Sequence, residues 1–179
     1  MSKGQPPISD VQLPGDTTAA CTFWVLEANF IRDFKGTKLP FFQEIQKTHP
    51  HALQKVTITW GEVVKGTHMQ KLLSLSHRWM DAGDPDPDGV QLKALKEFLS
   101  SADGKGFLLV WIDAQCMPQD RPEGSRSAED TESFKTMLGN VNMLFLGTSV
   151  LVLLDLSYVS RFWVSVDRLA PRPRVQPPV

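Results

Sequence analysis

The sequence predicts an α/β fold: a small three-layer domain built on a parallel sheet, with an N-terminal extension before it and a proline-rich tail after it. Three apolar runs of strand length, LLSLS, FLLVWI and VLVLL, alternate with segments of helical periodicity. The connections between the runs are long enough for helical crossovers, which are almost always right-handed. The pattern therefore predicts parallel strands in the succession βαβαβα.

The part of the chain before these runs is expected to form an arm and an extension. Residues 1–20 are rich in Pro, Gly, Ser and Asp, which predicts a flexible arm. Residues 21–70 are expected to pack on the sheet or to add strands to it. Phe23–Leu26 and Val56–Trp60 are the candidate edge strands. Val56–Trp60 is rich in β-branched residues, whereas the segment that begins at Cys21 could be a short strand or a helix.

Residues 71–169 are expected to form the α/β domain itself. Leu72–Ser76 is its first strand, and a loop with two prolines separates it from a helix that begins near Val90. Asp88 is expected to cap this helix, because aspartate is a favoured residue directly before a helical segment.

The second and third strands have the near-continuous apolar character of strands that are covered on both faces. They are Phe107–Ile112 and Val150–Leu154. Between them, Ser127 is expected to cap a helix with a single apolar face, and Gly147 to end it. After the third strand, Ser157 is expected to cap a short helix that runs through Trp163.

Residues 170–179 (APRPRVQPPV) form the expected disordered tail. Four prolines prevent this segment from continuing a helix or a central strand. The domain is therefore expected to stop near residue 169, as if truncated after its third helix.

Composition and charge exclude several classes of protein. The net charge is −1, and the 19 basic and 20 acidic residues are interspersed, so the sequence indicates no binding of nucleic acid. The first twenty residues lack the apolar core of a signal peptide, and the apolar stretch Met143–Leu156 is too short to cross a membrane, which needs roughly 20 residues. Only two cysteines are present, without the spacing of a disulfide framework or a zinc site. We therefore expect a soluble, cytoplasmic protein without a metal site.

Polar residues follow each of the three strands, at the edge where α/β sheets bind their ligands. They form three groups, Ser76-His77-Arg78-Trp79, Asp113-Ala114-Gln115-Cys116 and Asp155-Leu156-Ser157. Parallel strands bring their carboxyl ends to one edge, so we expect these groups to lie together.

The same residues carry a resemblance to known families. LSLSHRW, VWIDAQCMPQD, LFLGTSVLVLLDLS and SRFW together resemble the pattern of the heterokaryon-incompatibility (HET) domain. That family is itself similar to the Toll/interleukin-1 receptor (TIR) domain, which has a flavodoxin-like fold. The resemblance covers roughly Leu72–Asp167, and WID-x-x-C-x-x-Q is its most specific part.

The resemblance implies two function classes. Many TIR domains cleave NAD with a glutamate four residues after a tryptophan, and here Asp167 stands four residues after Trp163. A NAD glycohydrolase would use Asp167 and His77 as candidate catalytic residues. The candidate NAD-binding residues are Ser76, Arg78, Trp79, Asp113 and Trp163. Because aspartate is shorter than glutamate and the domain is expected to be truncated, we favour the other class, a non-catalytic module for signalling or self-recognition that binds protein partners or itself.

Three further readings follow from single motifs. Asp84–Gly89 (DPDPDG) matches the start of a calcium loop but lacks its final glutamate, so no calcium is expected. Cys116 with His77 has the residue types of a thiol nucleophile and its base, although a lone cysteine after a buried strand usually serves packing. Arg78 could hold a phosphate or pair with Asp113.

Overall fold

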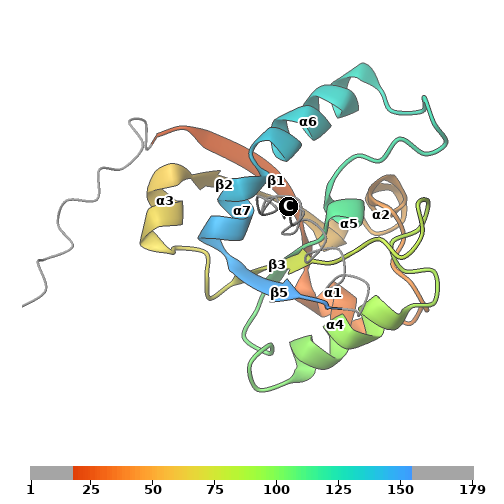
Figure 1. The fold of residues 1–179 in the computed structure, drawn as a ribbon, viewed down its shortest axis with the longest axis horizontal. Coiled ribbons are helices and arrows are strands. Elements are labelled where there is room, and N and C mark those ends of the chain that lie inside the picture. The colour runs from red at the N-terminus through yellow and green to blue at the C-terminus, as the bar shows by residue number, and fades with distance from the viewer. Residues whose placement is uncertain (1–17, 155–179) are drawn as a thin grey trace, which may run out of the picture.

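The structure is a computed structural model that describes residues 18–154, and over this range it is an α/β domain with a five-stranded mixed sheet. The strand order is β2-β1-β4-β3-β5, and Figure 1 shows β1 beside β2 and β3 beside β5. The strands are β1 (Ala20–Glu27), β2 (Leu53–Thr59), β3 (Leu72–Ser76), β4 (Leu109–Trp111) and β5 (Ser149–Val152). The α-helices are α1 (Ala28–Asp33), α2 (Phe42–Thr48), α3 (Trp60–Lys65), α4 (Val90–Ser100), α5 (Asp113–Cys116), α6 (Ala128–Gly139) and α7 (Val141–Gly147).

The three predicted strands lie side by side and are parallel, with β3 between β4 and β5. Four of the five residues of β3 are buried, as expected for a central strand with cover on both faces. The βαβαβ succession is confirmed: α4 connects β3 to β4, and α6 and α7 connect β4 to β5.

The prediction of a parallel sheet is wrong for the sheet as a whole. β1 is antiparallel both to β2, from Ala20↔Thr59 to Leu26↔Leu53, and to β4 through Leu26↔Val110 and Glu27↔Leu109. The two segments expected as edge strands do belong to the sheet, but of these two only β2 is an edge strand, since β1 lies between β2 and β4. Sequence periodicity shows that a strand has one exposed face and does not show the direction of its partner, which is why the mixed pairing was missed.

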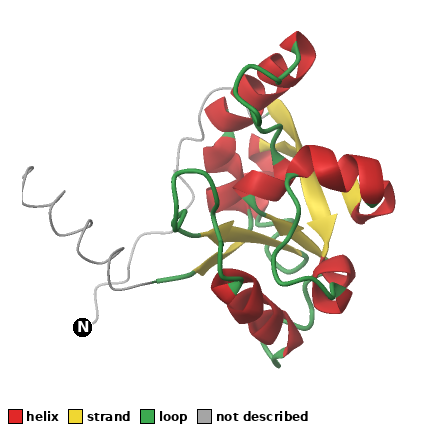
Figure 2. Cartoon of the chain, turned by 90° about the vertical axis from the view of Figure 1, so that its right-hand side faces the viewer, coloured by secondary structure: helices red, strands yellow, loops and turns green. Residues whose placement is uncertain are grey.

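Helices cover both faces of the sheet, which gives three layers (Figures 1 and 2). Leu75 of β3 lies with Leu92 and Leu95 of α4, and α1 packs against α4 on the same face. The next residue toward the N-terminus, Ser74, points to the opposite face and makes a 2.7 Å hydrogen bond to Thr148, which follows α7. There α3 and α6 pack against α7.

Local signals explain several helix boundaries. Ser127 caps α6 as predicted, with its side chain accepting a hydrogen bond from the Asp130 N–H at 3.0 Å. The predicted single helix before β5 is divided at Asn140 into α6 and α7, and α7 ends at Gly147. Among residues 18–154, no helix is long and apolar enough to span a bilayer.

Candidate functional site

The polar residues that follow β3 and β4 meet at the carboxyl edge of the sheet, because these two strands are parallel neighbours. The Nε2 atom of His77 lies 3.0 Å from Oδ1 of Asp113, and the Trp79 indole N–H donates to Oδ2 of Asp113 at 2.8 Å. Both carboxylate oxygens of Asp113 are therefore occupied by neighbours within the domain. The structure brings together three of the residues that the sequence singled out.

Gln91 of α4 determines the protonation of His77. The Gln91 amide nitrogen donates to the Arg78 carbonyl oxygen at 2.7 Å, and its Oε1 lies 2.5 Å from Nδ1 of His77. A carbonyl oxygen can only accept, so the orientation of the amide is fixed and Oε1 must accept a proton from Nδ1. Since Asp113 accepts from Nε2, both ring nitrogens of His77 donate, and the ring is an imidazolium.

The electrostatics agree with this assignment. Burial of His77 by itself lowers its pKa, but the hydrogen bond and charge of Asp113, with Gln91 and Asp86 adding to them, raise the pKa above its usual value. Burial of Asp113 by itself raises its pKa, yet His77, the Trp79 indole and the Ala114 N–H together hold that pKa below its usual value. The side chain of His77 is only 4% exposed, so the ion pair is sheltered on the histidine side.

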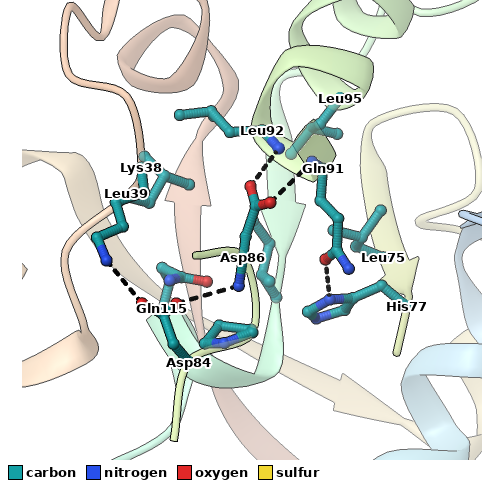
Figure 3. Close-up of a pocket in the computed structure, with 12 residues that line it drawn as sticks. Lys38, Leu39, Leu75, His77, Asp84, Asp86, Gln91, Leu92, Leu95 and Gln115 are labelled. Atoms are coloured by element: carbon teal, nitrogen blue, oxygen red, sulfur yellow. Dashed lines mark hydrogen bonds and ion pairs between the residues drawn. The ribbon is translucent and has the colours of Figure 1, made fainter. Parts of the chain in front are cut away.

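The loop between β3 and α4 is fixed to the start of the helix by Asp86 (Figure 3). Its carboxylate accepts from the N–H groups of Gln91 and Leu92 at 3.0 and 2.8 Å. The prediction that Asp88 caps this helix is therefore wrong. Two aspartates, Asp86 and Asp88, lie within the four positions before the helix, and spacing alone does not show which of them accepts from its free N–H groups.

Asp84, from the same loop, joins it to the N-terminal extension. Lys38 forms a 2.6 Å ion pair with Asp84, whose other oxygen accepts from the Asp86 N–H at 3.1 Å. Two of the three carboxylates of the calcium-like motif, those of Asp84 and Asp86, are thus bound to a lysine and to backbone donors. Within residues 18–154, no group of three metal-ligating side chains is present.

A small cavity of about 30 Å³ lies beside His77, between this loop and α4. Its walls are mainly apolar, with Leu75, Leu92, Leu95 and Ile112 among them, and the 5% exposed Gln115 also lines it (Figure 3). A volume of this size holds one or two water molecules. It does not hold a nucleotide, since ligand pockets commonly measure roughly 300–1,000 Å³.

The WID-x-x-C-x-x-Q motif is explained by local packing and hydrogen bonds. Cys116 is fully buried, and its Sγ lies 3.4 Å from the Ile112 N–H. The Gln119 side chain donates to the carbonyl oxygens of Asp113 and Met117 at 3.2 and 2.8 Å. The spaced polar residues of the motif therefore hold the turn that follows β4 and orient Asp113 toward His77.

The remaining candidate site residues that lie within residues 18–154 do not join the His77–Asp113 pair. Ser76 ends β3 on the face that carries α7, and Arg78 contributes its carbonyl oxygen to Gln91. The Asp113 carboxylate, suggested as a partner of Arg78, is instead held by His77 and Trp79. Asp167 and Trp163 lie outside the described residues, as does the expected Ser157 cap.

Cys116 is a poor nucleophile in this setting. Burial raises the pKa of its thiol to about 12, with a further increase from the nearby charge of Asp113, so almost no thiolate forms near neutral pH. His77, the base that the sequence suggested for it, already donates from both ring nitrogens and has no lone pair to accept the thiol proton.

Comparison of the chain with family models, with curated proteins and with solved structures gave no match. The resemblance to HET and TIR domains and the expected flavodoxin-like topology therefore stay predictions.

Proposed function

We propose that the chain is a non-catalytic, HET/TIR-like interaction module that acts in the cytoplasm, in signalling or self-recognition, by binding protein partners or copies of itself. The observation that carries this proposal is the closed His77–Asp113 pair at the carboxyl edge of the sheet. The position that would hold a ligand in an α/β enzyme is filled here by side chains that satisfy one another.

Acid–base catalysis at this edge requires a histidine nitrogen that faces a substrate with a lone pair or a transferable proton. His77 offers neither, because Gln91 and Asp113 bind its two N–H groups and its side chain is almost fully buried. Asp113 is equally committed, to His77 and Trp79. These contacts support a structural role for the pair, which fastens the loop after β3 to the turn after β4.

A cytoplasmic location is supported by the cysteines. Cys21 and Cys116 are both free and buried, and they lie in different parts of the core. Free thiols are the usual state of cysteine in a reducing compartment.

Incubation of the full chain with NAD tests the proposal against the alternative, a NAD glycohydrolase that uses Asp167. We expect no release of nicotinamide, measured by chromatography at high protein concentration, from either the wild type or an Asp167→Ala variant. Release by the wild type that Asp167→Ala abolishes would establish the enzyme and reject the module. Release that the substitution leaves unchanged would also reject the module and would place the chemistry on other residues.

A further inference from the structure

Gln91 connects the loop after β3 to His77 through a series of hydrogen bonds. Its amide nitrogen donates to the Arg78 carbonyl oxygen at 2.7 Å, and its Oε1 accepts from Nδ1 of His77 at 2.5 Å. His77 in turn donates from Nε2 to Asp113 at 3.0 Å. The series begins and ends on groups that only accept, a carbonyl and a carboxylate, so all three hydrogen bonds exist together only when both ring nitrogens of His77 carry a proton.

The series cannot survive the loss of one proton from His77. A neutral ring keeps its proton on Nε2, because the Asp113 carboxylate can only accept, and Nδ1 then carries a lone pair. If the Gln91 amide keeps its orientation, its Oε1 and Nδ1 are two acceptors that face each other. If the amide turns over and donates to Nδ1, its oxygen instead faces the Arg78 carbonyl oxygen. A neutral His77 therefore leaves Gln91 unable to hold both neighbours.

The surroundings leave room for the amide to turn. In a close-packed interior a side chain changes its orientation only when its neighbours move. Here Gln91 is only partly buried, and both Gln91 and His77 line the cavity of about 30 Å³ between the loop and α4 (Figure 3). Gln91 is therefore free to exchange one hydrogen-bond partner for the other without a rearrangement of the core.

The charges around His77 set the pH range in which its proton is lost. Burial lowers the pKa of His77, but Asp113 of α5, the hydrogen bond to Gln91 and the charge of Asp86 raise it above its usual value. Other charged residues beside the ring come from the N-terminal extension and the loop: Lys38, Asp84 and Arg78. Lys38 and Asp84 form an ion pair with each other, and α4 contributes no charged residue to the cavity. The imidazolium is therefore the form present at and below about pH 6.5.

We propose that Gln91 is a proton-dependent conformational switch. While His77 is an imidazolium, Gln91 holds the Arg78 carbonyl and so fastens the loop after β3 to the first turn of α4; when Nδ1 of His77 loses its proton, Gln91 releases Arg78. Arg78 and Trp79 lie at the carboxyl edge of the sheet, so the shape of this edge changes with pH. The switch does not depend on the function proposed above, since it involves residues of this chain alone.

A titration of the full chain from pH 6 to pH 9, followed by nuclear magnetic resonance, tests the switch. We expect the ring nitrogens of His77 to show that Nδ1 loses its proton while Nε2 keeps it. The chemical shift of the Arg78 carbonyl carbon should change with the same midpoint as the His77 ring, because Gln91 releases this carbonyl when the ring becomes neutral. That midpoint should lie above about pH 6.5, since the pKa of His77 is raised.

A Gln91→Glu variant separates the two events. A carboxylate accepts from Nδ1 of His77 but has no proton to donate, so the Arg78 carbonyl should be released at every pH. We expect the His77 ring to titrate at a higher pH in this variant, because a second carboxylate stabilises the imidazolium, and the Arg78 carbonyl to lose its response. His51→Gln is the matched control: His51 is exposed between α2 and β2, and its substitution should leave both midpoints unchanged.

Four results would overturn the proposal. The first is an Arg78 carbonyl shift that stays constant while His77 titrates. The second is loss of the proton from Nε2 before Nδ1. The third is an Arg78 response that Gln91→Glu leaves intact or that His51→Gln removes. The fourth is a His77 ring that is already neutral at pH 6 or still fully protonated at pH 9, since neither ring would change state in this range.

Discussion

His77 is a residue type that often serves in catalysis, but here its side chain makes hydrogen bonds that stabilise the fold. Its ring is placed between an amide oxygen and a carboxylate oxygen, and each accepts one N–H. Removal of either partner would leave a buried N–H without an acceptor, which costs roughly 1–3 kcal/mol. The pair therefore holds the ends of β3 and β4 together at the place where an enzyme of this architecture would bind its substrate.

The protonation of His77 predicts a pH dependence of stability. The folded pKa lies above the unfolded value, so the stabilisation is fully present below about pH 6.5 and is lost as the pH rises through the folded pKa. We expect the free energy of unfolding of the wild type to fall relative to a His77→Gln variant between pH 6 and pH 9. Urea unfolding at several pH values measures this difference.

The contribution of Asp113 to stability changes in a separate pH range, so it does not affect the comparison between pH 6 and pH 9. The folded pKa of Asp113 is lowered, so its contribution is present above about pH 4 and is lost only as the pH falls further. At pH 6 the His77→Gln variant should be less stable by about 1–2 kcal/mol, a range reduced because the Asp113 side chain is 37% exposed. Parallel stability curves for the two proteins between pH 6 and pH 9 would show that folding does not raise the pKa of His77, and would contradict the assignment.

At the scale of the elements, α4 depends on a carboxylate from the loop before it. An Asp86→Ala variant leaves the N–H groups of Gln91 and Leu92 without their acceptor, so we expect a loss of about 0.5–2 kcal/mol in the free energy of unfolding. Asp88→Ala is the matched control, since Asp88 is exposed and two positions away. Urea denaturation compares the two variants, and an equal loss in both would contradict the assignment of the cap to Asp86.

The sequence predicted the central elements well because their signals are local. β3 has the predicted bounds, Leu72–Ser76, and the parallel arrangement of its neighbours followed from the length of the crossovers. That arrangement also predicted that His77 and Asp113 would meet. Gln91 was missed because periodicity separates the buried from the exposed face of a helix and does not show which polar side chain of the first turn faces a strand end.

At the scale of the whole molecule, the N-terminal extension and the α/β unit share one sheet and one core. β1 lies between β2 and β4, and its side chains Phe23, Val25 and Leu26 are completely buried. The cover over this strand is uneven, however. α6 contributes a single buried side chain, Met137, whereas α5, which packs against both β1 and α2, has three buried residues, Ala114, Gln115 and Cys116.

This unevenness predicts that the two thiols become accessible by different openings. The Cys21 Sγ lies 3.9 Å from the Thr136 carbonyl oxygen of α6, so detachment of α6 alone should expose it. Cys116 should react only when the domain unfolds. Burial raises the pKa of both thiols, to about 12 for Cys116, so neither reacts readily in the closed state. We expect an alkylating reagent to modify Cys21 at least about tenfold faster than Cys116, as measured by peptide mass spectrometry.

The dependence of each rate on denaturant shows which opening it reports. Alkylation of Cys116 should accelerate with urea as steeply as global unfolding does, because both expose the same surface. Alkylation of Cys21 should depend on urea only weakly, since detachment of one helix exposes much less surface than unfolding of the whole domain. Equal alkylation rates and an equal dependence on urea at the two cysteines would contradict this prediction. They would mean that α6 detaches from β1 only when the whole domain unfolds.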